Sequence, residues 1–549
     1  MLKQLSGLDS MFLYAESDRA PLEVSSLQIY DPSTHPDGRV KFTEILATFA
    51  ERIERSKVFR RKLLTVPFAL DYPYWVEDED FDLEYHVRHI ALPKPGGWRQ
   101  LMDLAARLQA QQLDLARPLW VVYIIEGLNE IPGARPGCFG MFMKMHHATI
   151  DGVSGQEIQA AIHDFEPIPA DASRYEPSPG RARPAPGTVR LLLRSPLSNL
   201  SKALRLGGSL AAAAPGLVRA GLAGRGSERT PVPKTVFNRG RVSPSRVVDG
   251  HLYDLAEVKA VSKALDGTIN DVVLAVVGGA LRRYLAARDE LPAETLVAAC
   301  PMDVRGRDDH GEEVDNLVSA MLTSLHTEMA DPAERVRAVH EGTEEAKSKM
   351  ERIGPRRMAE IPMNLPSPVA RGLFPLLMEL TVRSGTVPFN TMVTNVAGIR
   401  KPVYLAGAEM VAMLGMGPVV HQAGLFHAVF SYNGVISIMF TACRQMLPDP
   451  EFYAECIDAA WRELRDAALS GRGRRKTPGR KTGGKKASAK KAAGRKKAAK
   501  KTAGKKTTGK KTPAKKTTGK KAGRKKAKRR AAGKSASRMR RAGATGNDA

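Results

Sequence analysis

The sequence predicts an α/β fold of two domains, followed by a disordered basic tail. Residues 1–170 and 235–470 each alternate short β-branched or aromatic runs with longer amphipathic stretches, which is typical of strands alternating with helices. Residues 171–234 lie between them and combine a proline-rich linker with an amphipathic basic crossover segment. Residues 471–549 hold Lys, Ala, Gly, Thr and Arg in loose repeats without an aromatic residue, so they cannot bury a core.

The elements of the two halves follow from local patterns. Apolar residues at helical spacing predict helices, and β-branched or aromatic runs predict strands. In the N-terminal half, the predicted strands are 22–30, 120–126 and 138–145, and the predicted helices are 42–56 and 98–113. In the C-terminal half, the predicted strands are 296–300, 392–396, 426–432 and 435–443, and the predicted helices are 268–288 and 449–469.

Two of these C-terminal elements carry a specific local signal. Thr268 is a predicted N-cap, and Asp271 stands at the capping-box position three residues later. Asn433-Gly434 separates two strand-like runs and predicts a hairpin with a tight type I′ turn.

The charge is very unevenly distributed. The chain has 549 residues and a formal net charge of +27, but residues 471–549 contain 33 Lys and Arg and a single acid, Asp548. The residues before Gly471 hold 52 basic and 57 acidic side chains, so the predicted folded part is near neutral. The high pI therefore gives no reason to expect that this part binds nucleic acid.

The remaining composition favours a cytoplasmic protein. The four cysteines are widely separated without metal-type or CxxC spacing, so we expect buried free thiols, no metal and a reducing compartment. The N-terminus has no secretory apolar region, and no run of 18 apolar residues predicts a transmembrane helix.

The heptapeptide His146-His147-Ala148-Thr149-Ile150-Asp151-Gly152 carries the strongest chemical signal. It has the pattern HHxxxDG and lies where the predicted strand 138–145 ends and a helical pattern begins. A neutral imidazole can take a proton from an alcohol or an amine, and a loop between rigid elements is a common mount for such a group. The alternative interpretation is a pair of ordinary histidines at a strand end.

The segment 189–226 interleaves leucines with arginines and lysines. One interpretation is a crossover helix packed on the folded part. The other is a helix that rests on anionic lipid, with leucines at the acyl boundary and arginines at the head groups.

Five motifs in order resemble the bacterial wax ester synthase/acyl-CoA:diacylglycerol acyltransferase family, and the resemblance covers roughly residues 1–470. They are Leu5–Phe12 at the N-terminus, the PLW motif Pro118-Leu119-Trp120, the HHxxxDG motif, the ND block Asn270–Leu274, and Asn395–Ile399. The last departs from the family pattern NVPGP, because Ala397 and Ile399 replace the prolines. The HHxxxDG motif alone is shared with condensation domains of peptide synthetases; the PLW motif and the ND block favour the ester-forming family.

The resemblance implies a CoA-dependent acyltransferase fold like that of chloramphenicol acetyltransferase, with an active-site tunnel at the interface of two α/β domains. It implies transfer of a long-chain acyl group from acyl-CoA to diacylglycerol or to a long-chain alcohol, with no cofactor and no metal. His147 is the expected general base.

The resemblance also implies roles for the other motif residues. His146 orients the loop, Gly152 leaves room for the turn and substrate, and Asp151 is a structural acid for which Arg305 is the expected partner. In the ND block, Asn270 and Asp271 are expected on the substrate side; Asn270 is a candidate oxyanion donor, with a helix N-terminal role as the alternative. We expect Pro118, Leu119 and Trp120 to pack near the tunnel.

Two other interpretations remain open. One is an inactive acyltransferase-fold protein that binds nucleic acid or tethers lipid through its tail, and the other is an amide-forming condensation enzyme. The tail 471–549 has three interpretations, namely a nucleic-acid contact, an anchor on anionic lipid or a solvated appendage. We expect a cytoplasmic enzyme held peripherally at the inner membrane or at lipid droplets. The sequence does not specify the oligomeric state.

Overall fold

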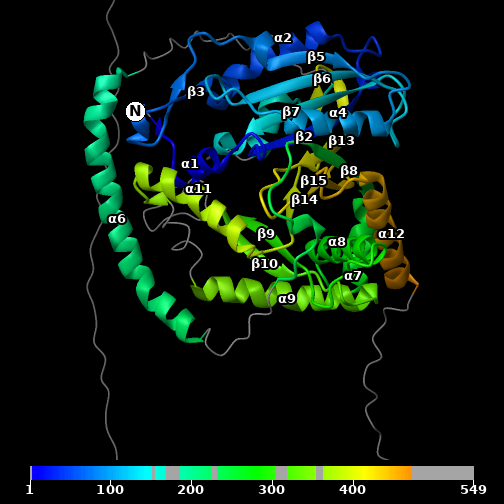
Figure 1. The fold of residues 1–549 in the computed structure, drawn as a ribbon. Helices are drawn as coiled ribbons and strands as arrows, with labels where there is room; N and C mark the ends of the chain where they lie inside the picture. Colours follow the sequence, from blue (N-terminus) through cyan, green and yellow to red (C-terminus); the bar gives the residue numbers. More distant parts are fainter. Residues whose placement is uncertain are drawn as a thin grey trace, which may run out of the picture. The chain divides into compact units, whose positions relative to one another are not determined.

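The computed structural model describes residues 3–150, 155–167, 186–223, 232–303, 318–353 and 363–470 (Figure 1). These residues form two six-stranded mixed sheets, one small three-stranded sheet and the helices that cover them. The predicted disorder of residues 471–549 and the predicted linker at 168–185 lie outside the described residues.

The first large sheet has the strand order β12-β13-β2-β7-β6-β5. Only β5 and β6 are parallel neighbours; the other pairs in this sheet are antiparallel. Its strands are β2 (Glu23–Asp31), β5 (Val87–Ala91), β6 (Trp120–Leu128), β7 (Cys138–His146), β12 (Tyr404–Leu405) and β13 (Ala408–Met416). The predicted strands at 22–30, 120–126 and 138–145 are thus confirmed to within two residues at each end.

The second large sheet has the order β10-β9-β11-β14-β15-β8. Its strands are β8 (Arg246–Asp254), β9 (Val297–Asp303), β10 (Val318–Ser324), β11 (Thr391–Ala397), β14 (Leu425–Tyr432) and β15 (Val435–Cys443). The predicted hairpin is confirmed, with Asn433 and Gly434 at φ values of 41° and 90° in the turn between β14 and β15. Both angles are positive, as a type I′ turn requires.

The small sheet consists of β1 (Lys3–Gln4), β4 (Tyr74–Glu77) and β3 (Arg61–Leu64). The helices are α1 (Gly7–Ala15), α2 (Phe42–Arg52), α3 (Leu83–His86), α4 (Trp98–Ala110), α5 (Gly155–Ile162), α6 (Thr188–Ala223), α7 (Leu255–Ala264), α8 (Ile269–Ala286), α9 (Pro332–Ile353), α11 (Ser367–Ser384) and α12 (Pro450–Leu469). The helices predicted at 42–56 and 98–113 end several residues earlier than expected, at Arg52 and Ala110.

The C-terminal half of the sequence contributes two strands, β12 and β13, to the first sheet. Strand β13 follows β11 in the chain but pairs with β2 of the first sheet, with Met416 opposite Ser25 and Glu409 opposite Asp31. The backbone groups along that side of β2 are therefore satisfied by a distant part of the chain. The division into residues 1–170 and 235–470 stays a prediction, because this pairing joins the two stretches within one sheet.

The helices lie on defined faces of the sheets (Figure 1). Residues Ile45 and Phe49 of α2 pack against one face of the first sheet, and Leu101 and Met102 of α4 pack against the other. In the second half, α8 is the central buried helix and packs with α7, α9 and α12. Its predicted start is confirmed, because Thr268 and Asp271 form a reciprocal capping box.

Within the described residues, no single helix is both long and apolar enough to span a bilayer. Helices α7 and α8 reach the required hydropathy only as a pair, and the chain bends by 94° between them.

Candidate active site

Strand β7 positions the histidine pair from the centre of the first sheet. All nine of its residues are buried, and it pairs with β2 on one side and β6 on the other. The backbone N–H of His146 donates to the carbonyl of Leu119 at 3.0 Å, and the N–H of His147 donates to that of Leu22 at 3.2 Å. A 3-10 helix, η5 (His147–Ile150), then begins directly at the second histidine. Both histidines are therefore fixed through their main chain to neighbouring segments.

The side chain of His146 is fully buried and faces the protein interior. Its Nδ1 accepts a hydrogen bond from the N–H of Ala148 at 3.1 Å, and its Nε2 lies 3.3 Å from Oε2 of Glu16. Because Nδ1 accepts a hydrogen bond, the ring proton is on Nε2, which faces the carboxylate without a hydrogen bond of normal geometry. His146 thus connects Glu16 to the backbone that follows His147, in agreement with its expected orienting role.

His147 is surrounded by protein but remains partly exposed. Its ring stacks on Phe12 with centroids 3.9 Å apart and planes inclined by 17°. Nδ1 is buried and makes no hydrogen bond of normal geometry to another residue in the described part of the chain. The pKa of His147 is lowered to about 4, first because burial disfavours the imidazolium and second because His146 is close. At neutral pH the ring is neutral and can accept a proton.

Helix α1 supports both histidines. Phe12 on the helix and Glu16 at its C-cap are four residues apart, so they lie on the same side, and each contacts one ring of the pair. Ser6 caps the start of the helix, since its Oγ accepts from the N–H of Asp9 at 3.1 Å. The motif Leu5–Phe12 is one of the five that resemble the family, but the sequence of the motif does not show that the ring of Phe12 contacts a histidine. Nothing local in the sequence indicates that Glu16 meets His146.

The PLW motif packs against the same loop. Leu119 is fully buried and packs in one cluster with Leu5, Leu63, Trp75 and Ala148. The Nε1 of Trp120 donates to the carbonyl of Phe59 at 2.8 Å, and its ring stacks on His86. Pro118 is buried where the chain enters β6. Leu119 therefore contacts the motif itself, whereas Trp120 belongs to the core between α2 and the sheet.

Asp151, Gly152 and Arg305 lie outside the described residues, so the predicted pairing of Asp151 with Arg305 stays a prediction. A different arginine contacts the described part of the motif. The Nη2 of Arg61 donates to the carbonyl of Thr149 at 2.9 Å, and its guanidinium lies 4.3 Å from the ring centroid of Trp75. Arg61 precedes the motif by more than 80 positions, which is why the sequence alone did not single it out.

The ND block lies at the N-terminus of α8. Both side-chain oxygens of Asp271 accept hydrogen bonds, from Thr268, from His340 at 2.8 Å and from Thr343 at 3.0 Å. The pKa of Asp271 is lowered because these hydrogen bonds together outweigh the opposing effect of burial. Asp271 therefore organises this helix terminus. The substrate-side roles of Asn270 and Asp271 stay predictions.

The departure from the family pattern at residues 395–399 leaves its glycine, Gly398, in place. The N–H of Gly398 donates to the carbonyl of Ser431 at 2.9 Å, and a Cβ on Gly398 would lie 2.2 Å from that oxygen. Only glycine fits this approach of β11's end to β14.

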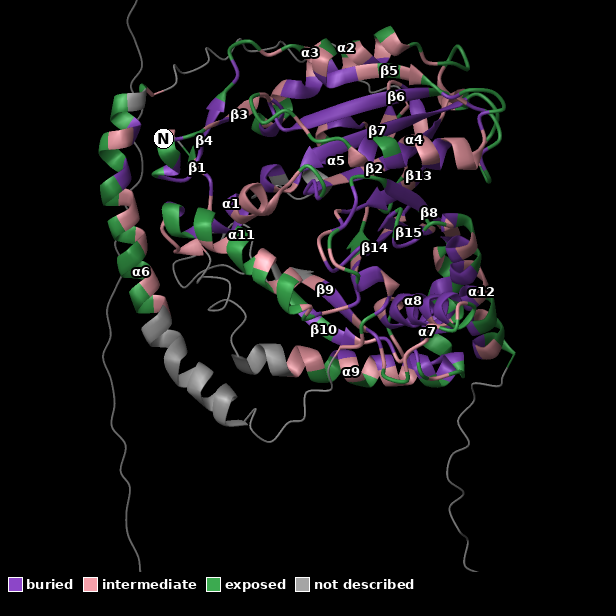
Figure 2. Cartoon of the chain, in the orientation of Figure 1, coloured by how far each residue is buried: buried purple, intermediate pink, exposed green. Residues whose placement is uncertain are grey.

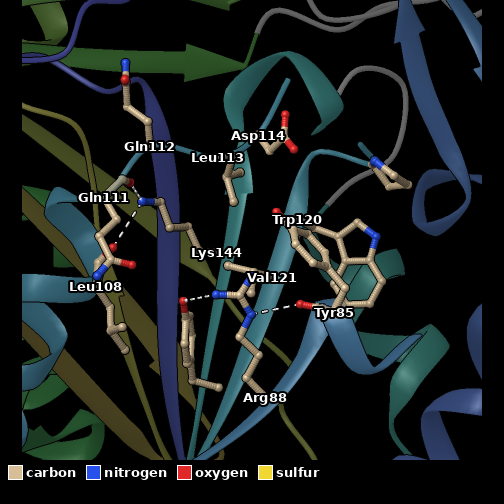
Figure 3. Close-up of a pocket in the computed structure, with 12 residues that line it drawn as sticks. Tyr85, Arg88, Leu108, Gln111, Gln112, Leu113, Asp114, Trp120, Val121 and Lys144 are labelled. Carbon is tan, nitrogen blue, oxygen red and sulfur yellow. Dashed lines mark hydrogen bonds between the residues drawn. The ribbon is translucent and has the colours of Figure 1, made fainter. Parts of the chain in front are cut away.

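A small cavity of about 60 Å³ lies beside Trp120 and Pro118, lined by residues of β5, β6 and β7 and of the end of α4 (Figure 3). Neither motif histidine lines it. Lys144 reaches its wall from β7 and donates through Nζ to the carbonyls of Leu108, Gln109 and Gln111 at the end of α4. Burial lowers the pKa of Lys144 to about 8, and the nearby Glu23 carboxylate opposes that shift. This contact ties α4 to the sheet.

Within the described residues, no group of three or more His, Cys, Asp or Glu side chains is arranged to hold a metal ion. The four cysteines are buried free thiols, as predicted.

The comparison with protein families decides the classification. The catalytic-domain model of wax ester synthase/diacylglycerol acyltransferase matches residues 5–273, and the model of that family's C-terminal domain matches residues 314–465. The chain belongs to this family. The expectation drawn from the five motifs is confirmed, and the fold and the acyltransferase function are those of the family.

Relatives and solved structures agree with the family. A protein of Mycobacterium tuberculosis named as a diacylglycerol O-acyltransferase is 31% identical over 468 residues, which cover 84% of this chain and 90% of the relative. Another from that organism is 33% identical over 470 residues and is covered to 99%. The solved wax ester synthase/diacylglycerol acyltransferase of Marinobacter aquaeolei is 26% identical, with a TM-score of 0.61 and 85% and 99% of the two chains covered.

A condensation domain of the calcium-dependent antibiotic synthetase shares the fold. It is 17% identical with a TM-score of 0.51, over 85% of this chain and 96% of that one. The fold is therefore common to the ester-forming family and to condensation domains, and it is the match to the family models that assigns this chain to the ester-forming family.

Proposed function

We propose that this protein transfers a long-chain acyl group from acyl-CoA to the hydroxyl of diacylglycerol, and that long-chain alcohols are a second acceptor class. The observation that carries the proposal is His147, a neutral and partly exposed imidazole held within the HHxxxDG motif. The relatives named as diacylglycerol O-acyltransferases support diacylglycerol as the first acceptor.

The proposed reaction uses one proton acceptor. Because Nδ1 of His147 is buried, Nε2 takes the hydroxyl proton as the alcohol oxygen attacks the thioester carbonyl carbon. The carbon–sulfur bond breaks, and the imidazolium returns the proton to the CoA thiolate. The products are an ester and free CoA, and no covalent enzyme intermediate or further cofactor takes part.

The low pKa of His147 suits this cycle. A base with a pKa of about 4 is unprotonated at neutral pH, and its imidazolium gives up the proton readily. The low pKa also makes the neutral ring a weak base. This is offset because the negative charge that develops on the nearby carbonyl oxygen stabilises the imidazolium. Asn270 is the proposed donor to that oxyanion, and Asp151 and Gly152 are proposed to hold the loop.

Purified protein supplied with palmitoyl-CoA, diacylglycerol and hexadecanol in competition tests the proposal. Released CoA is measured with a thiol reagent, and the esters are separated by chromatography. We expect triacylglycerol as the main product and no CoA release above background from His147→Ala. Retention of full activity by His147→Ala would overturn the proposed mechanism, and turnover with an amine but not an alcohol would favour a condensation enzyme.

The tail has a separate proposed function. Its excess of positive charge is suited to anionic surfaces, and with lipid substrates we favour a membrane or droplet surface over nucleic acid. A chain truncated after Ser470 is expected to keep turnover and to lose salt-sensitive binding to anionic vesicles.

A further inference from the structure

Helix α6 exposes a row of apolar side chains, whereas an ordinary surface helix buries its apolar side. Five apolar side chains, Val189, Leu193, Leu197, Leu200 and Leu204, are between 58% and 74% exposed. They recur every three or four positions, so they form one continuous stripe along the helix. We call these five residues the α6 stripe. Figure 2 shows the described turns of the helix as mostly exposed or intermediate, with few buried residues.

The opposite side of α6 attaches the helix to the protein through several polar side chains and the buried Leu191. Lys202 donates to Oδ1 of Asp71 at 2.8 Å, and Ser198 donates to the same oxygen at 3.2 Å. Asn199 accepts from the N–H of Ser367 at 3.1 Å and donates to the carbonyl of Leu70. Because these contacts fix the orientation of the helix, the α6 stripe faces outward.

A second apolar group lies beside the helix. Phe68 is 89% exposed and has a φ of 57°, a left-handed conformation that is unfavourable for a phenylalanine. Phe68 lies two residues before Leu70, whose carbonyl binds Asn199 of α6. Displaying a large aromatic ring at a cost in backbone strain is typical of residues with a function.

The charges of α6 indicate the occupant. Residues 188–223 contain five Lys and Arg and no Asp or Glu. Arg190 and Arg194 are exposed, and each follows a stripe residue by one position, which places it about 100° around the helix. An apolar stripe bordered by cations, without an acid, is complementary to an interface that presents acyl chains beneath anionic head groups.

We propose that the α6 stripe, with Phe68, docks the protein on an anionic lipid surface. The stripe enters the acyl boundary while Arg190 and Arg194 contact phosphates at its border. This docking surface is independent of the proposed function, because it follows from the exposed residues of α6 and from Phe68.

A local label tests the stripe separately from the basic tail. All four natural cysteines are buried, so a cysteine introduced at the surface can be labelled selectively with an environment-sensitive nitrobenzoxadiazole dye. The full chain with Leu197→Cys is compared with Lys259→Cys, an exposed position on α7. The probe is a vesicle of phosphatidylcholine with about one-third phosphatidylglycerol. We expect a blue shift and a severalfold rise in emission at 197, and no change at 259.

Three results would overturn the proposal. The first is no shift at 197 while the protein sediments with the vesicles, since the tail alone would then hold it. The second is an equal shift at both positions. The third is a concentration-dependent shift at 197 without vesicles, which would assign the stripe to contact between two copies of the chain.

Substitution gives an independent measurement. Leu193→Gln/Leu197→Gln retains helix-favouring residues and charge, and it should weaken vesicle binding at least about tenfold at high salt. The control is Leu115→Gln/Leu469→Gln, which changes two exposed leucines elsewhere and should have no effect. With the acceptor dispersed in detergent, both variants should turn over like the unmodified protein. Loss of vesicle binding with retained turnover thus separates the docking surface from the chemistry.

Discussion

Phe12 and His147 stack face to face, with ring centroids 3.9 Å apart, and this contact links helix α1 to the proposed base. Four residues further on, Glu16 reaches the other histidine of the motif, so one helix contacts both rings. The position of the base therefore depends on a segment more than 130 residues away in the chain.

The stacking contact should contribute to turnover. Phe12→Leu retains bulk but removes the ring face, and stacking of aromatic rings is worth about 0.5–1.5 kcal/mol. We expect kcat to fall by about two- to tenfold with little change in the KM for acyl-CoA. Phe42→Leu is the matched control, because Phe42 stacks on His89, away from the motif. An equal loss in both variants would show that the effect is not specific to His147.

Glu16 is expected to act as a positioning residue through His146. In Glu16→Ala the buried Nε2 of His146 loses the carboxylate that lies 3.3 Å away, and a buried donor without a polar neighbour costs about 1–3 kcal/mol. We expect kcat to fall by about ten- to a hundredfold with KM nearly unchanged, and Glu16→Gln, which keeps an acceptor oxygen, to restore most of it. Glu126→Ala is the control, since Glu126 pairs with His89 at the surface. A change in KM with kcat unaltered would contradict a positioning role, and so would a failure of Glu16→Gln to restore kcat.

The pH dependence of turnover follows from the pKa of His147. Its folded-state pKa is about 4, below the ordinary 6.5, so the base stays unprotonated as the pH falls through 6 and 5. The acid limb of the kcat/KM profile should therefore lie well below pH 6.5 and not at the ordinary histidine value. Initial rates in overlapping buffers between pH 4.5 and 8 measure it. An acid limb with a midpoint near 6.5 would mean that the ring is more solvated than the structure indicates.

Stability should also decrease in acid because of a buried histidine outside the motif. His427 lies between Thr391 and Tyr453, and burial lowers its pKa to about 3. A neutral histidine whose pKa is lowered on folding favours the folded state fully at a pH above its unfolded-state pKa. That contribution is lost as the pH falls from about 6.5 toward 3, because only the unfolded chain takes up the proton. The slope is at most about 1.4 kcal/mol per pH unit. Urea titrations at several pH values give the free energy of unfolding, and its decrease with falling pH should be shallower in His427→Asn. An unchanged dependence on pH would exclude His427 as a source of the acid sensitivity.

Lys144 should matter for folding more than for chemistry. Lys144→Met removes a buried cation, leaves Glu23 without its neighbour and frees three carbonyls at the end of α4. Breaking such a buried arrangement costs about 3–5 kcal/mol. The midpoint of chemical unfolding should drop accordingly, and adding Glu23→Gln should recover part of it. If the double variant is as unstable as the sum of the two single variants, Lys144 and Glu23 are not coupled.

The sequence by itself determined the elements whose signals are local. The strand that ends in His146, the capping box of Thr268 and Asp271, and the Asn433-Gly434 hairpin depend on neighbouring residues, so periodicity and turn chemistry identified them. The family followed from five motifs in order. The amphipathic segment 189–226 was also visible, although the direction in which its leucines face stayed open between two interpretations.

The tertiary structure decided what depends on contacts between distant residues. It brought β13 beside β2, Phe12 and Glu16 to the histidine pair, and Arg61 to Thr149. It also turned the polar side of α6 inward, by pairing Lys202 with Asp71. Hydrophobic periodicity shows that a helix or strand has two unlike faces, but only long-range packing determines what each face meets, because the partners lie on other elements of the fold.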